Sequence, residues 1–87
     1  MDLKQEIRKA SEDKKLIIGF NSVLKSLSQK NVKKIVIAKN CSEEMRNRIL
    51  NYAELSEIPV DIFSGDNKEL GIACRKSFGI SVLGIGK

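Results

Sequence analysis

One short segment of the sequence combines features that suit the binding of a phosphate or a base edge. Gly19 follows an apolar run, and Phe20, Asn21, Ser22 and Lys25 come directly after it. A helix that begins here presents unpaired backbone N–H groups and the positive end of its dipole to an anion. The Asn21 amide both donates and accepts hydrogen bonds, as contact with a purine edge requires. The alternative is that Asn21 only caps the helix and that Lys25 is an ordinary solvated lysine.

A second candidate follows the most β-branched run of the chain, residues 35–38. Lys39, Asn40 and Cys41 form this loop. Taken alone, they are better explained as a turn and a helix cap than as a binding site.

A third candidate is a loop in which an aromatic residue follows two cations. Arg75 and Lys76 precede Ser77, Phe78 and Gly79, and Phe78 is one of four aromatic residues in the chain. An exposed aromatic side chain in a basic loop can stack on an extruded base. The alternative is that Phe78 folds back into the core.

Nothing in the sequence assembles an enzyme active site. The chain has no histidine, which excludes His-based acid–base chemistry, Ser-His triads and Cys/His zinc sites. Cys41 and Cys74 show no metal-binding or redox spacing, so we expect two reduced thiols. Asp61 and Glu69 are the acids worth weighing for catalysis, and neither has a visible partner base. We therefore expect no enzymatic activity, no metal, no cofactor and no small-molecule substrate.

The charge of the protein is unevenly distributed along the chain. Sixteen Lys and Arg face eleven Asp and Glu, which gives a net charge of +5, and residues 14–42 hold seven lysines and no acid. We expect a basic end of the fold that gathers Lys25, Lys39, Arg75 and Lys76, where binding of phosphates would be steeply salt-dependent. The alternative is a lysine-rich solvated surface with no partner.

Apolar periodicity alternates between helix and strand along the 87 residues. Helical stripes are expected from residue 3, from 21, from 42 and at 70–74, and strands at 16–18, 35–38, 60–63 and 80–83. Asp2 is placed to cap the first helix. Ser42 starts the third helix, whose apolar stripe is Met45, Ile49, Tyr52, Ala53 and Leu55 and should be buried. Residues 84–87 are expected to form a frayed end. This order predicts a single α/β domain over residues 1–87, with a four-stranded, mainly parallel or mixed sheet and helices on both faces.

No apolar run approaches the roughly 20 residues that span a bilayer. The N-terminus alternates acidic and basic residues, which resembles neither a secretory signal nor a transit peptide. We therefore expect no membrane partner and a cytoplasmic protein.

With these residues in view, the chain resembles the superfamily of kink-turn RNA-binding ribosomal proteins. The large-subunit ribosomal protein L-thirty-e family is its nearest branch. The resemblance covers nearly the whole chain. The family's glycine-x-asparagine helix opening is matched by Gly19 and Asn21, and its strand followed by Ala-x-Asn is matched by residues 35–40. Its Ser-Gly-x-Asn-x-Glu-Leu-Gly-x-Ala-Cys block is matched from Ser64 to Cys74, and this block is the most specific signal.

The resemblance implies a three-layer α/β/α sandwich that binds a kink-turn or a related purine-rich internal loop. It implies that Gly19, Asn21, Ser22 and Lys25 contact sheared G·A pairs and nearby phosphates. Asn40 and Cys41 would line the neighbouring loop. The stacking loop would comprise Arg75, Lys76, Phe78 and Gly79.

The function expected from this resemblance is that of a structural constituent of the large ribosomal subunit, with ribosomal RNA and neighbouring ribosomal proteins as partners. An alternative is a free-standing kink-turn binder that acts on other ribonucleoproteins or on its own transcript. A third possibility is a small α/β module whose basic end contacts an acidic protein.

Overall fold

Helices and strands alternate along the chain in the predicted order. The computed structural model describes residues 3–87, so the predicted capping role of Asp2 lies outside the described residues. The elements are α1 (Leu3–Glu12), β1 (Leu16–Ile18), α2 (Phe20–Ser28), β2 (Val32–Ile37), α3 (Glu43–Ser56), β3 (Val60–Ile62), α4 (Asn67–Ala73) and β4 (Val82–Gly86).

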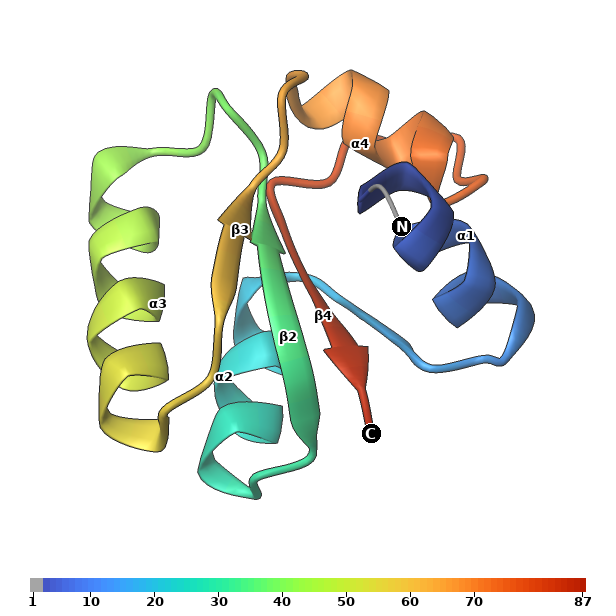
Figure 1. Cartoon of the computed structure of the whole chain (residues 1–87). Coiled ribbons are helices and arrows are strands. Elements are labelled where there is room, and N and C mark those ends of the chain that lie inside the picture. Colours follow the sequence, from blue (N-terminus) through green and yellow to red (C-terminus); the bar gives the residue numbers. More distant parts are fainter. Residues whose placement is uncertain (1–2) are drawn as a thin grey trace.

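The four strands form one mixed sheet in the order β1-β4-β2-β3. β2 and β3 are parallel, whereas β4 runs antiparallel to both β1 and β2. The mixed sheet is as predicted. The last of the four strands, β4, lies inside the sheet between β1 and β2 (Figure 1).

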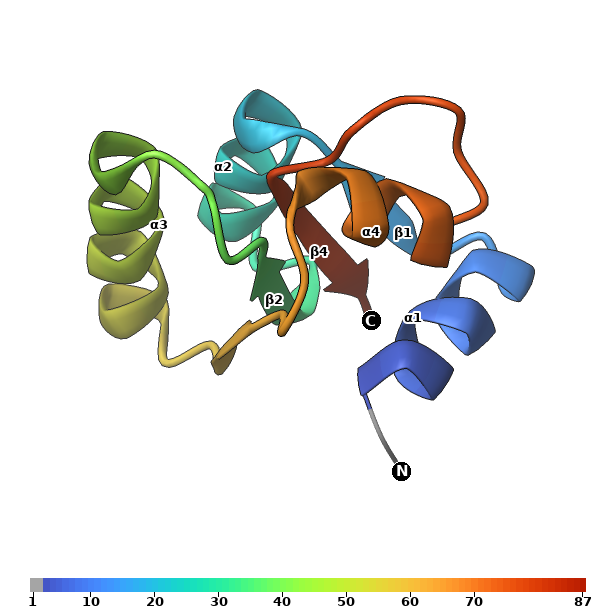
Figure 2. The same ribbon diagram turned by 90° about the horizontal axis from the view of Figure 1, so that it is seen from above.

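Helices cover both faces of the sheet, which confirms the three layers. Figure 2 shows α1 and α4 on one side of β2 and β4, and α2 and α3 on the other. Side chains alternate along β2, so Val36 packs under α1 and α4 while Ile35 and Ile37 pack under α2 and α3. Burial of each such side chain contributes about 1.5–3 kcal/mol. Other members of the first cluster are Ile7, Leu70, Cys74 and Leu83, and of the second Val23, Leu27, Ile49 and Val82.

The C-terminal segment was predicted wrongly as a frayed end. Leu83, Gly84 and Ile85 are buried and pair with both β1 and β2. A Cβ at Gly84 would lie 3.6 Å from side-chain atoms of Ile17 and Val32. A Cβ would make only ordinary van der Waals contacts there, and Gly84 lies inside β4 rather than at its end.

The third helix begins where predicted but buries a narrower stripe. The Ser42 hydroxyl accepts a hydrogen bond from the Met45 N–H and so caps the helix that Ser42 was predicted to start. Ile49 and Ala53 are buried, whereas Tyr52 is 51% exposed and Leu55 is 83% exposed, so their predicted burial is wrong. α3 is the longest helix at 14 residues, and within residues 3–87 no helix is long and apolar enough to cross a membrane.

All four helices end in the same way. Lys14, Lys30, Glu57 and Arg75 follow the helix ends with φ between 57° and 60°. In each case the next N–H donates to the carbonyl oxygen five residues earlier, at 2.8–3.0 Å. This is the Schellman arrangement, in which glycine normally occupies the left-handed position. A side chain there costs about 1–2 kcal/mol of conformational energy.

Candidate nucleic-acid interface

The three predicted loops meet at one end of the sheet, where β4 begins. The Gly19 N–H donates to the Val82 carbonyl at 3.1 Å, and the Ala38 N–H donates to the Ser81 carbonyl at 2.8 Å. The start of α2 and the end of β2 therefore lie beside the chain that leaves the Phe78 loop. We call the candidate residues at this end the sheet-end surface: Gly19, Phe20, Asn21, Ser22, Lys25, Lys39, Asn40, Cys41, Arg75, Lys76, Phe78 and Gly79.

The opening of α2 leaves backbone donors available. Gly19 is the N-cap with φ 102° and ψ 151°, a conformation that glycine adopts and other residues avoid. Within the described residues no side chain caps this helix, so the alternative that Asn21 is the cap is wrong. Asn21, Ser22 and Lys25 are exposed, and Asn21 and Lys25 share a face because they lie four residues apart. Phe20 is half-buried and packs against the core beneath α2 and α3.

The loop after β2 is fixed by a pair of asparagines. The Asn40 amide donates to Asn67 Oδ1 at 3.1 Å, and Asn40 Oδ1 accepts the Asn67 N–H at 2.9 Å. Lys39 is exposed, and its N–H donates to the Gly65 carbonyl at 3.0 Å. Cys41 is 8% exposed and packs in the core, where burial raises the pKa of its thiol above the ordinary value. Asn40 therefore joins two loops, and the Cys41 thiol is withdrawn from the surface.

The loop after α4 carries the exposed aromatic side chain. Phe78 is 50% exposed, so the alternative that it folds into the core is wrong. Arg75, Lys76 and Gly79 are exposed as well. The loop backbone packs closely on α4, because a Cβ at Gly71 would overlap the Phe78 carbonyl oxygen and lie 3.1 Å from its carbonyl carbon. The fold thus holds Phe78 outward beside two cations.

Two residues that position this surface were missed by the sequence analysis. Asn67 holds Asn40, and its carbonyl accepts the Ile80 N–H at 2.9 Å where the loop rejoins the sheet. Gly71 has no Cβ, which lets the backbone of the Phe78 loop pack directly on α4. Both lie in the block from Ser64 to Cys74 that resembles the family, but the sequence alone does not show that they position the loop.

The lysines of the acid-free stretch are divided between the two ends of the sheet. Lys25 and Lys39 belong to the sheet-end surface. At the opposite end, the Lys15 carbonyl accepts the Gly86 N–H at 2.7 Å. Lys33 lies in β2 near its start, and with it in the far group are Lys14 and Lys30. The expectation of a basic end holds for its four named residues but does not extend to the whole lysine-rich stretch.

The chain is similar in sequence to archaeal ribosomal proteins. It is 36% identical to the large ribosomal subunit protein eL30 of Methanosphaera stadtmanae, over 95% of this chain and 85% of that protein. It is 37% identical to the eL30 protein of Methanothermobacter thermautotrophicus over the same shares.

Solved structures with low sequence identity share the fold. A protein with unknown function from Bacillus halodurans superposes with a TM-score of 0.89 at 20% identity, over 97% of this chain and 83% of that chain. The Giardia lamblia 15.5kD RNA binding protein superposes with a TM-score of 0.85 at 23% identity, over 98% of this chain and 71% of that one. The family model for the Ribosomal protein L7Ae/L30e/S12e/Gadd45 family matches residues 1–87, and with the sequence identities above this shows that the chain belongs to that family.

Proposed function

We propose that this protein is a structural constituent of the large ribosomal subunit that binds ribosomal RNA through the sheet-end surface. The names of the eL30 relatives describe large-subunit proteins, and the chain spans most of their length. The single observation that carries the RNA contact is that the uncapped start of α2 and the exposed Phe78 loop occupy one end of the sheet.

The proposed mechanism is capture of a bent RNA by groups already in position. The first N–H groups of α2 and the Asn21 amide would contact base edges and phosphates. Phe78 would stack on a base that the bend has extruded. Lys25, Lys39 and Lys76 would contact the backbone and supply the salt-dependent part of the affinity.

The experiment is a titration of the protein with a kinked RNA duplex and with a straight duplex of equal length and charge. We expect Asn21→Ala and Phe78→Ala each to weaken binding of the kinked duplex by about 1–3 kcal/mol. Lys30→Ala is the matched control because Lys30 is exposed at the opposite end of the sheet, and it should change little. Equal small losses at all three positions, or indifference to the kink, would contradict the proposal.

The ribosomal assignment is tested separately by sedimentation. The tagged protein should sediment with large-subunit particles in high-magnesium lysate. Recovery of the protein mainly with other RNAs after ribosome depletion would contradict it and favour a free-standing RNA-binding protein.

A further inference from the structure

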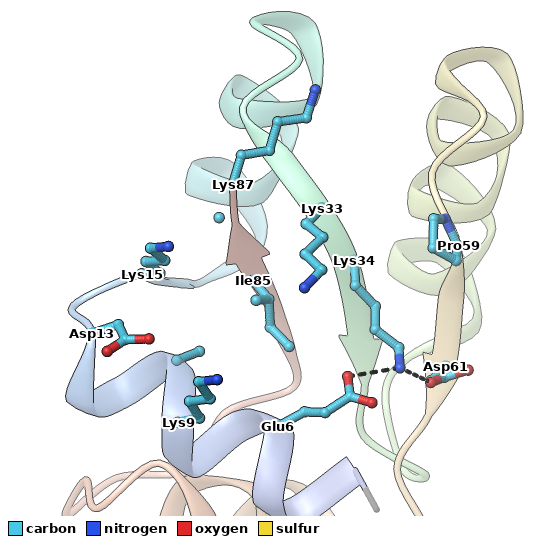
Figure 3. Close-up of a pocket in the computed structure, with 12 residues that line it drawn as sticks. Glu6, Lys9, Asp13, Lys15, Lys33, Lys34, Pro59, Asp61, Ile85 and Lys87 are labelled. Carbon is cyan, nitrogen blue, oxygen red and sulfur yellow. Dashed lines mark hydrogen bonds and ion pairs between the residues drawn. The ribbon is translucent and has the colours of Figure 1, made fainter. Parts of the chain in front are cut away.

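A hollow of about 690 Å³ lies on the α1 side of the sheet, toward the end opposite the sheet-end surface. Its apolar lining comes from Ala10, Pro59 and Ile85, and it is bordered by α1, the starts of β2 and β3 and the end of β4. Figure 3 shows Lys9 and Lys15 on one side of it and Lys33 lying over the face of β2. We call it the lysine hollow.

A β-bulge brings two consecutive lysines to this hollow. In β2, Val32 pairs with Gly86 and Lys34 pairs with Ile85, so Lys33 is an extra residue between them. Without the bulge, alternation would send Lys33 and Lys34 to opposite faces. Both line the hollow instead, which is the kind of re-aiming that bulges produce.

Lys34 is paired with two carboxylates, which leaves this cluster with one net negative charge. Its ammonium lies 2.6 Å from an Asp61 oxygen and 2.9 Å from a Glu6 oxygen, and both ion pairs are drawn in Figure 3. These hydrogen bonds, the one to Asp61 first, raise the pKa of Lys34. Within residues 3–87 no ion pair engages Lys9, Lys15 or Lys33, all of which are exposed.

The side chains that line the hollow carry a net charge of +2, because five lysines stand against the three acids Glu6, Asp13 and Asp61. Outside the Lys34 cluster, the charged residues that line the hollow are one acid, Asp13, and four lysines: Lys9, Lys15, Lys33 and Lys87. Lys14 and Lys30 stand exposed at the same end of the sheet and add to it. Such a rim of unpaired ammonium groups is complementary to a run of phosphates.

The lysine hollow is electrostatically separate from the sheet-end surface. From Ser81 to Lys87 the chain extends about 20 Å at about 3.4 Å per residue. At physiological salt, charges are screened over about 8 Å. Phosphates bound at one end of the sheet therefore interact little with the lysines or the phosphates at the other end.

We propose that the lysine hollow is a second RNA-contacting surface, which takes the phosphates of an RNA segment other than the one at the sheet-end surface. The proposal rests on the proposed function, since that function surrounds the protein with RNA. An enclosed small ligand fits less well, because the inward polar groups of Glu6, Lys34 and Asp61 already satisfy one another and the free ammonium groups lie on the exposed rim. With both surfaces occupied, the protein bridges two RNA segments.

The test measures whether a second RNA joins a preformed complex. The protein is loaded onto an immobilised kinked duplex, and a labelled straight RNA duplex is then titrated at several salt concentrations. The variant combines Lys9→Gln, Lys15→Gln and Lys33→Gln. The control combines Lys4→Gln, Arg8→Gln and Arg48→Gln, which removes the same charge from exposed positions that line neither surface.

We expect the wild-type complex and the control to bind the second duplex, and the hollow variant to bind it at least about tenfold more weakly. The slope of log affinity against log salt should fall by roughly 2–3, because each lost phosphate contact contributes about 0.7–0.9. Affinity for the kinked duplex should stay within about twofold of wild type, since the two surfaces lie beyond the screening length.

Three results would overturn the proposal. They are equal binding of the second duplex by variant and wild type, displacement of the kinked duplex by the straight one, and capture of poly-glutamate by a complex that ignores the straight duplex. If the wild type fails to bind the kinked duplex, the proposed function fails instead. The straight-duplex titration of free wild-type and variant protein then still tests the hollow.

Discussion

Replacement of Gly71 by alanine tests how the Phe78 loop is positioned. An alanine Cβ would overlap the Phe78 carbonyl oxygen and lie 3.1 Å from the carbonyl carbon. The obstructing atoms are main chain, so no side-chain rotation relieves the clash and the loop must move away from α4. The Lys76 N–H, which donates to the Gly71 carbonyl at 2.9 Å, holds the other side of the same loop.

Two opposing effects set the change in the free energy of unfolding. Alanine favours the helix over glycine by about 1 kcal/mol. Overpacking against a fixed backbone costs about 1–3 kcal/mol. The net loss of stability is therefore about 0–2 kcal/mol, and the variant should remain folded.

RNA binding should suffer more than stability does. If the displaced loop no longer presents Phe78, Gly71→Ala loses the stacking contribution of about 1–3 kcal/mol, which is roughly 5-fold to 150-fold in Kd. The assay is a double-mutant cycle on the kinked duplex, with Gly71→Ala, Phe78→Ala and both together. Because the glycine acts through the phenylalanine, the double variant should bind about as weakly as Phe78→Ala alone. Additive losses, or wild-type affinity for Gly71→Ala, would refute the reasoning.

Three further predictions concern stability and reactivity. Asn40→Ala removes two hydrogen bonds, whereas Asn67→Ala removes one. Denaturant unfolding should therefore show a loss of unfolding free energy of about 1–3 kcal/mol for Asn40→Ala and of about 0.5–1.5 kcal/mol for Asn67→Ala. A larger loss for Asn67→Ala than for Asn40→Ala would contradict the pairing. Lys34→Met should cost about 1–2 kcal/mol at neutral pH. The ion pairs raise the pKa of Lys34 above 10.5, so their stabilisation is fully present below pH 10.5 and is lost as the pH rises through the folded-state pKa. A difference from wild type that does not shrink at all as the pH rises above 10.5 would argue against this. Cys74 is buried with its pKa raised to about 11, so maleimide at pH 8 should label it no faster than the protein unfolds, and rapid labelling of the native protein would contradict this.

The order of elements could be predicted from the sequence because each buried stripe has a clear period. Ile35, Val36 and Ile37 are buried on both faces of the sheet, and a continuous β-branched run is typical of such a strand. A strand at residues 80–83 was predicted, but its continuation to Gly86 could not be, because Gly84 and Gly86 lack the side chains on which periodicity depends. Their place in the sheet is set by neighbours distant in sequence, such as Val32 and Lys15.

The candidate site shows the same division between local and distant information. The exposed Phe78 and the helix opening at Gly19 carry local signals of residue type and spacing. The Asn40–Asn67 pair spans 27 residues and becomes visible only once β2 and α4 are brought together. The lysines of residues 14–39 look continuous in sequence, but the chain runs along the sheet from one end to the other, so the sequence alone does not show which of them share a surface.

The central position of β4 has a consequence for how the protein is made. β1 contacts the rest of the sheet through β4, and β2 pairs with β3 on its other side. A nascent chain that has emerged only as far as residue 81 can thus join β2 to β3 but leaves β1 with no partner strand. The sheet is completed only when β4 inserts between β1 and β2. During synthesis, the apolar faces of α1 and α2 therefore stay partly exposed until β4 has emerged.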